Sequence, residues 1–205
     1  MNGLQGYVYL ASSSPRRAEL LAQLGVEHRP LAPAARENAE RLEEERSGET
    51  PDAYVRRVAL AKLEAARARR VRRGLPEAPI LAADTTVALG RRILGKPADA
   101  GEAAATLRLL AGRSHRVLTA VAVSHGTQSF MAVSVSRVRF APLSERVIAH
   151  YVESGEPFGK AGAYAVQGQI AAWIERIEGS HSGIMGLPLF ETRELLARAR
   201  VRFAG

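Results

Sequence analysis

The stretch "LASSSPRRAELLAQLG", residues 10 to 25, joins the end of an apolar strand to a serine-rich turn and an amphipathic helix. Ser14 is a suitable N-cap, and Pro15 suits the first helical position. Leucines then recur on one helical face until Gly25 ends the pattern. A strand that passes through a short turn into a helix favours an α/β fold.

Two arginines, Arg16 and Arg17, fall in the first turn of this helix. That end carries free backbone N–H groups and the positive pole of the helix dipole, so it favours an anion over a cation. With the serine hydroxyls of Ser12 and Ser14 beside two guanidinium groups, the stretch indicates a phosphate-binding site. From these residues alone, the alternative is a capped surface helix with two solvated arginines.

Composition narrows the classes of protein. The 205 residues suffice for one α/β domain, and the net charge of +8 favours acidic partners without choosing among them. With no cysteine, the chain has neither disulfides nor thiolate metal ligands, which fits a reducing interior. No apolar run approaches the length needed to span a bilayer. We therefore expect a cytoplasmic protein without a membrane partner.

The rest of the sequence alternates predicted strands and helices, so residues 1–205 are expected to form a single α/β domain. Segment 33–49 is acidic and poorly patterned, so we expect a loop or a frayed helix there. The strands are expected at 7–11, 78–89, 114–125, 128–140 and 170–177, with helices at 50–73, 99–112, 144–154 and 189–200. The strands on either side of residues 125–128 form a hairpin.

Asp84 is the one carboxylate in an otherwise apolar strand. Burying it without a partner would cost several kcal/mol, so a cation, a metal ion or a hydrogen-bonding turn should lie beside it. A structural cap on Thr85 and Thr86 is the alternative. Lys62 lies on the helical stripe that should face the core, where a lysine either reaches outward or meets an anion.

Three further residues lie in turns or glycine-rich loops. Lys96, between Gly95 and Pro97, sits in a stiff turn that could direct its ammonium into a cleft, although taken alone it reads as a surface lysine. Lys160 and Gln167 flank a loop with several glycines, where the backbone can approach a ligand closely.

Several common site motifs are absent from the sequence. It contains no Walker-type phosphate loop, no dinucleotide-binding glycine motif and no Gly-x-Ser-x-Gly nucleophile elbow. The five histidines lack metal-ligand spacing, so they are expected to be surface or structural residues.

Six blocks of the sequence together resemble one known family, the Maf family. In order, the blocks are "LASSSPRRAELL", "AADTTV", "LGKP", "GRSHRVLTAV", "KAGAYAVQG" and "MGLPLFET". The bacterial members are called septum formation inhibitors and are nucleoside triphosphate pyrophosphatases. The resemblance implies a fold like that of the inosine triphosphate pyrophosphatases: a twisted mixed sheet flanked by helices, and two lobes with a central cleft.

The resemblance also implies an activity. Family members hydrolyse the bond between the α and β phosphates, with Mg²⁺ or Mn²⁺, to release a nucleoside monophosphate and pyrophosphate. The "KAGAYAVQG" block and Thr85 resemble the branch that acts on dTTP and UTP. Other nucleotides, including modified ones, remain the alternative substrates.

Individual site residues are carried over by position. Asp84 matches the general base and a metal ligand, and Lys62 and Lys96 match the site lysines. Arg16, Thr85 and Gln167 match the specificity positions. The second acidic metal ligand falls on Glu37 when counted forward from Arg16, which is our expectation, and on Glu43 when counted back from the helix at Pro51.

A rival function from another class is a non-catalytic regulator of cell division that binds nucleotides or nucleic acid. In a nucleic-acid-binding protein, basic residues are expected to cluster together with aromatic residues that stack on the bases. In this sequence the basic residues are dispersed, so nucleic acid is not the expected partner. The resemblance also leads us to expect a homodimer.

Overall fold

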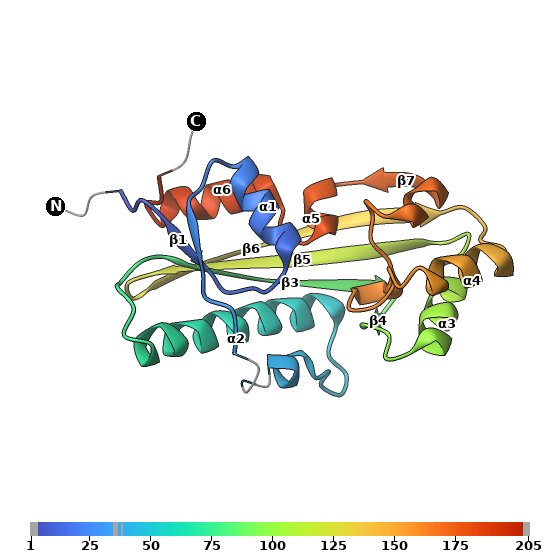
Figure 1. Cartoon of the computed structure of the whole chain (residues 1–205), viewed down its shortest axis with the longest axis horizontal. Coiled ribbons are helices and arrows are strands. Elements are labelled where there is room, and N and C mark those ends of the chain that lie inside the picture. Colours follow the sequence, from blue (N-terminus) through green and yellow to red (C-terminus); the bar gives the residue numbers. More distant parts are fainter. Residues whose placement is uncertain (1–3, 35–36, 38, 203–205) are drawn as a thin grey trace.

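The elements of the chain are arranged around one extended sheet (Figure 1). The computed structural model describes residues 4–34, 37 and 39–202. The strands in this part are β1 (Val8–Leu10), β2 (His28–Pro30), β3 (Ile80–Leu89), β4 (Arg92–Leu94), β5 (Ser114–His125), β6 (Gln128–Phe140) and β7 (Ile174–Glu178).

The sheet is mixed, in the order β2-β1-β3-β5-β6-β7, with β4 paired to β3. β1 runs parallel to β2 and β3, whereas β3, β5, β6 and β7 form an antiparallel series. The parallel part requires crossover helices, and the long β5–β6 hairpin supplies the antiparallel part. The expected α/β class with a mixed sheet flanked by helices is confirmed.

Helices cover both faces of this sheet. The α-helices are α1 (Pro15–Gln23), α2 (Pro51–Arg72), α3 (Ala100–Leu110), α4 (Glu145–Glu153), α5 (His181–Met185) and α6 (Leu189–Arg198), and the 3₁₀ turns are η1 (Ala39–Glu43), η2 (Ala161–Ala163) and η3 (Gln169–Trp173). α1 and α6 lie on one face and α2 lies on the other (Figure 1).

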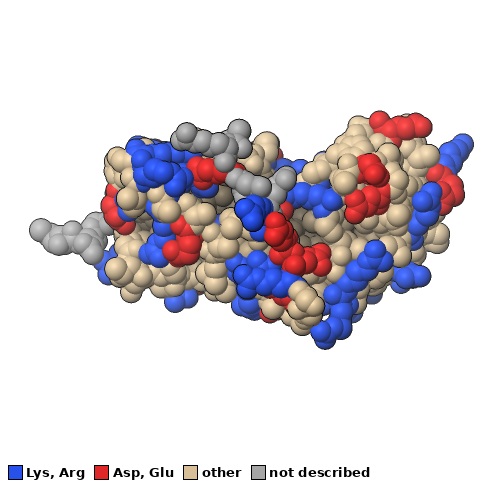
Figure 2. Space-filling model, turned by 90° about the horizontal axis from the view of Figure 1, so that it is seen from below, with Lys and Arg blue, Asp and Glu red and all other residues tan. Residues whose placement is uncertain are grey.

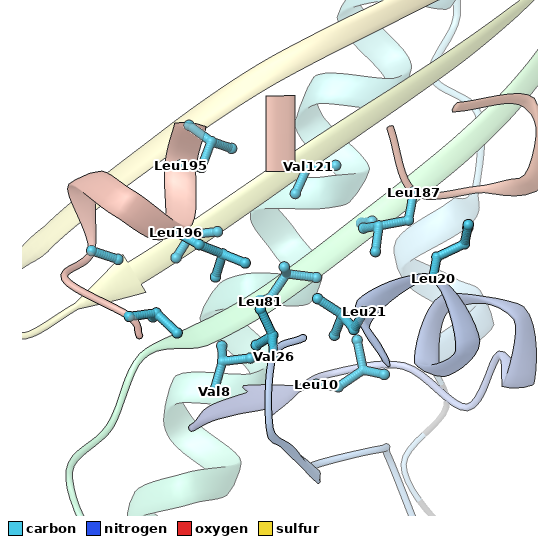
Figure 3. Packing of buried hydrophobic residues seen from close by; sticks show 14 residues of the cluster. Val8, Leu10, Leu20, Leu21, Val26, Leu81, Val121, Leu187, Leu195 and Leu196 are labelled. Atoms are coloured by element: carbon cyan, nitrogen blue, oxygen red, sulfur yellow. The ribbon is translucent and has the colours of Figure 1, made fainter. Parts of the chain in front are cut away.

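Alternation along β3 decides which side chains meet which helix. Leu81 packs with leucines of α1 and α6 (Figure 3), whereas Ala82 and Ala88 face the side covered by α2. Asp84 therefore points to the face that α2 covers, and its neighbour Thr85 points to the face that α1 covers.

A second apolar cluster lies at the other end of the long strands. It joins Val87 and Phe140 of the sheet to Leu107 of α3, Ile148 of α4 and Tyr164. The Leu81 cluster and this second cluster mark the two lobes, which share strands β3 and β5. Val87 and Tyr164 of the second cluster line a cleft.

Most helix ends agree with the sequence. Thr50, Asp99 and Ser144 each accept a hydrogen bond from a backbone N–H of the first turn. Ser14 is the exception: it occupies the N-cap position of α1, but its side chain forms no cap hydrogen bond. The serine expected to close this helix end leaves the backbone N–H groups there available.

Other expectations were wrong in detail. The strand expected over residues 170–177 begins only at Ile174, because residues 169–173 form η3. The short elements β2, β4 and α5 were not predicted, since three to five residues carry too little periodicity. Among the described helices, none is both long and apolar enough to cross a membrane.

Candidate active site

A cleft of about 390 Å³ opens between the start of α1 and the loop around Lys160, and a hollow is visible in Figure 2. Its size falls within the range of about 300–1,000 Å³ that is typical of small-molecule sites. Of the predicted site residues, the cleft is lined by Ser12, Ser14, Arg16, Arg17, Lys62, Asp84, Thr85, Lys96 and Lys160.

Four charged side chains form an alternating series in this cleft. The ammonium of Lys62 lies 2.6 Å from Asp84 Oδ1 and 2.7 Å from Glu43 Oε1. The other oxygen of Glu43, Oε2, lies 2.6 Å from the ammonium of Lys96. Two carboxylates and two ammonium groups thus balance one another within hydrogen-bonding distance.

Asp84 has the partner that its burial requires. Asp84 is only 5% exposed, and the ammonium of Lys62, on the helix α2 that covers this face of the sheet, neutralises its charge. Thr86 is only a weak additional donor, with its hydroxyl 3.5 Å from Asp84 Oδ2. Lys62 therefore faces the core side of its helix and meets an anion there.

Glu43 is held in place through backbone contacts of its own segment. The Tyr54 hydroxyl donates to the carbonyl of Glu43 at 2.8 Å, and Arg57 donates to the carbonyls of Leu42 and Glu44. Burial opposes ionisation of Glu43, but Lys62 and Lys96 outweigh this effect and hold its pKa below the ordinary value. Tyr54 and Arg57 were not singled out from the sequence, because contacts with backbone carbonyls leave no motif.

Glu37 lies elsewhere. Its carboxylate is 2.8 Å from Arg69 and 3.1 Å from Arg72, at the C-terminal end of α2. The hydrogen bond from Arg69 is the main cause that lowers the Glu37 pKa to about 2. Glu43, and not Glu37, shares the Lys62 ammonium with Asp84, so the count back from the helix at Pro51 leads to the glutamate beside Asp84.

The two arginines of α1 have different surroundings. Arg17 donates to the carbonyl of Gly186 at 2.8 Å, to Ser12 Oγ at 3.1 Å and to Thr85 Oγ1 at 3.3 Å. Burial lowers the pKa of Arg17, and the nearby carboxylates of the cleft oppose this shift. Three of its five N–H donors therefore contact three segments of the protein, and Arg17 also lines the cleft.

Arg16 is the free cation of the pair. It lines the cleft half-buried, and within the described part of the chain it forms no ion pair or hydrogen bond. Lys160 lies across the cleft, and among the described residues its ammonium donates to two backbone carbonyls, those of Glu156 and Phe158. Burial and then the positive charge of Arg16 lower the pKa of Lys160. The two cations line the same cleft.

The loop after Lys160 lies against β3. At Gly162 φ is +70°, and a Cβ there would lie 2.8 Å from the side chain of Val87, so a larger residue could not approach so closely. Val166 lines the cleft from this loop. Gln167, the next residue, is exposed and is not among the lining residues, so the structure does not bring it together with the other site residues.

Two other predictions concern Thr85 and the histidines. The Thr85 hydroxyl lies 3.0 Å from that of Thr119, besides its contact with Arg17. His115 is buried, its Nε2 lies 2.8 Å from the Tyr164 hydroxyl, and burial lowers its pKa to about 4. A structural role is thus confirmed for His115. In the described residues, no group of three or more His, Cys, Asp or Glu side chains is placed to hold a metal ion.

The sequence matches known proteins over almost its whole length. Residues 7–199 match the family model described as Maf-like protein. The chain is 63% identical over 199 residues to the dTTP/UTP pyrophosphatase of Burkholderia pseudomallei (strain 1710b). The aligned region covers 96% of this chain and 95% of the relative. The chain is 58% identical over 200 residues to the dTTP/UTP pyrophosphatase of Cupriavidus pinatubonensis, covering 98% and 100% of the two chains. Because the family model spans nearly the whole sequence, and these relatives align over almost their full length, the chain belongs to the Maf family.

Proposed function

We propose that this protein is a nucleoside triphosphate pyrophosphatase that hydrolyses the α–β phosphoanhydride of dTTP and UTP. The observation that carries the proposal is the pairing of two features in one cleft. Arg16 and Lys160 line the cleft and have no carboxylate partner among the described residues, and the series of Asp84, Lys62, Glu43 and Lys96 lies in the same cleft. The names of the relatives, dTTP/UTP pyrophosphatase, agree with this reading.

The anion site suits a polyphosphate. A triphosphate resists hydrolysis largely because its negative charges repel an incoming nucleophile. Arg16 and Lys160 would offset that charge from opposite sides of the cleft, and the backbone N–H groups at the start of α1 add donors, since Ser14 does not cap them. A planar guanidinium at position 16 can bind two phosphate oxygens at once.

Asp84 is the residue best placed to activate water. It is the buried carboxylate of the cleft, and Lys62 holds it from the side of α2. We propose that Asp84 orients a water molecule and accepts its proton while a new P–O bond forms and the α–β anhydride bond breaks. The products are a nucleoside monophosphate and pyrophosphate.

A divalent ion, Mg²⁺ or Mn²⁺, fits the donor set. Asp84 and Glu43 both present oxygen atoms to a single cation, the Lys62 ammonium. Mg²⁺ is commonly bound by one or two carboxylates together with substrate phosphate oxygens, so a third protein ligand is not required. We propose that Asp84 and Glu43 hold the ion, which when bound neutralises charge on the phosphate oxygens.

We propose that Gln167 contributes to base selection. Uracil and thymine present an acceptor, O4, where cytosine presents an amino donor, and a glutamine amide can donate to O4. Its position beside Val166, which lines the cleft, supports this role. Because mismatched polar edges are rejected strongly, CTP should be a poor substrate.

The test is a nucleotide panel with matched Mg²⁺ or Mn²⁺, in which pyrophosphate and nucleoside monophosphate are measured separately. The expected result is equal release of both products, fastest from dTTP and UTP. A preference for GTP, ITP or CTP would overturn the substrate assignment alone. Absence of pyrophosphate release from every nucleotide would overturn the enzymatic assignment and favour a binding protein.

We also propose that the protein is cytoplasmic and forms a homodimer. The lack of cysteine fits a reducing compartment. Sedimentation of the purified protein tests the dimer, and a mass near that of the 22.1 kDa chain would contradict it.

A further inference from the structure

The loop after α4 folds back on itself at Glu156. The backbone N–H of Gln169 donates to the Glu156 carboxylate, at 3.1 Å from Oε2 and 3.4 Å from Oε1. A Cβ at Gly168 would lie 2.0 Å from the same Oε2 and 3.3 Å from the carbonyl of Ala165. The carboxylate therefore occupies the space that any side chain at position 168 would need.

The same residue also contacts the other end of the loop. The Lys160 ammonium donates to the backbone carbonyl of Glu156. Glu156 thus joins two segments: the one that brings Lys160 to the anion site, and the one that ends at Gln169 and includes Val166 and Gln167. It is not itself among the residues that line the cleft.

The segment between these ends has other supports as well. Gly162 N–H donates to the carbonyl of Gly95 at 3.0 Å, and Ala165 N–H donates to the Tyr151 hydroxyl at 3.2 Å. Beyond residue 165, Gly168 N–H donates to the carbonyl of Ala165 at 2.9 Å, and Val166 is buried in the second apolar cluster. Among the described residues, the side-chain hydrogen bond to the backbone of this part of the loop is that of Glu156 with Gln169. Glu156 thus contributes to the position of residues 166–168 relative to Lys160.

We infer that Glu156 is a positioning residue for base selection, which holds the Val166–Gln167 segment in register with Lys160. The inference rests on the proposed function. A ligand whose phosphates are bound near Lys160 presents its base at a set distance from them. If the loop could shift after residue 165, it could form similar contacts with different bases. The selectivity between bases would then fall before the binding of the phosphates weakens.

The experiment compares kcat/KM for UTP and for CTP in four proteins: wild type, Glu156→Ala, Glu156→Gln and Glu153→Ala. Glu153 is a matched control, an exposed glutamate at the end of α4 whose side chain forms no ion pair or hydrogen bond in the described part of the chain. Glu156→Ala should reduce the UTP-to-CTP preference about tenfold, mainly by improving CTP relative to UTP. Glu156→Gln keeps one acceptor oxygen and should retain most of the preference, as should Glu153→Ala.

A change at Gly168 tests the same contact from the other side. Gly168→Ala should displace the Glu156 carboxylate and reduce the preference as Glu156→Ala does. Because the two changes break one contact, the double variant should lose less than the product of the two single losses. This variant also serves if Glu156→Ala folds poorly.

Equal falls in kcat/KM for UTP and CTP in Glu156→Ala and Gly168→Ala would overturn the inference, since a merely structural role lowers both alike. Hydrogen exchange of the backbone amides of residues 165–169 provides a second readout without nucleotide. It should rise in Glu156→Ala and not in Glu153→Ala, and unchanged exchange would likewise overturn the inference. If the wild type releases no pyrophosphate, the proposed function fails, and the exchange measurement still decides whether Glu156 holds the loop.

Discussion

The Lys62 ammonium lies between the carboxylates of Asp84 and Glu43, where a metal ion would bind. Removing this ammonium should therefore strengthen metal binding in the absence of nucleotide. The distances of 2.6 and 2.7 Å leave no room for a second cation between the same oxygens. With Lys96 the cluster has two positive and two negative charges, and a free divalent ion therefore meets a neutral site. Lys62→Met keeps a similar chain length and leaves the cluster with a net charge of −1.

The magnitude follows from Coulomb's law. A pair of unit charges at about 4 Å interacts by about 1 kcal/mol in water and by about 4 kcal/mol at an effective dielectric constant of about 20. Removing one positive charge near a divalent ion should therefore favour binding by at least about 2 kcal/mol, or roughly 30-fold in Kd. The side chain of Lys62 is 17% exposed, which places the site between these two limits.

The assay is a Mn²⁺ titration without nucleotide, in which the electron paramagnetic resonance signal measures the concentration of free Mn²⁺. Lys160→Met is the control, because it removes one positive charge from the same cleft but breaks no contact with a carboxylate side chain in the described residues. Its Kd should change much less. An unchanged Kd in Lys62→Met, or equal changes in the two variants, would refute the reasoning. Lys62→Met should also be less stable without metal, since Asp84 loses its partner, and Mn²⁺ should stabilise it more than the wild type.

Asp84→Asn should abolish pyrophosphate release while the far-ultraviolet circular dichroism spectrum stays that of the wild type; turnover by the folded variant would remove Asp84 from the mechanism. Arg16→Lys should raise KM for UTP about tenfold with little loss of stability. Arg17→Lys should lower the melting temperature, because it breaks contacts to three segments. The reverse pattern would contradict the separate roles inferred for the two arginines from their surroundings. Gln167→Ala should narrow the UTP-to-CTP preference more than it weakens pyrophosphate inhibition, and an unchanged ratio would exclude Gln167 from base selection. Glu37→Gln should lower the urea midpoint at neutral pH, because the pKa of this carboxyl is depressed to about 2 in the folded state; the difference from wild type should shrink as pH falls from about 4.5 toward 2, and a constant difference would mean that the ion pairs do not cause it.

Local features of the sequence were sufficient for the fold class. Strand and helix periodicity, the caps at Thr50, Asp99 and Ser144, and the turn of the long hairpin depend on residues near one another in the chain. The burial of Asp84 also follows locally, because a carboxylate in an apolar strand must find a partner. The sequence pattern thus predicted that Asp84 needs a cation, a metal ion or a hydrogen-bonding turn beside it, and that Lys62 either reaches outward or meets an anion. The pairing of these two residues came only from the structure.

The identity of the contacts required the tertiary structure. Whether Glu37 or Glu43 meets Lys62 depends on how the segment between α1 and α2 folds, and counting along the chain cannot show it. Arg16 and Arg17 are identical in type and adjacent in sequence, and both line the cleft, yet only Arg17 also donates to the carbonyl of Gly186, 169 residues away, among the described residues. Periodicity records which face of an element is buried, but the partner on that face comes from distant parts of the chain, and so only the folded structure decides it.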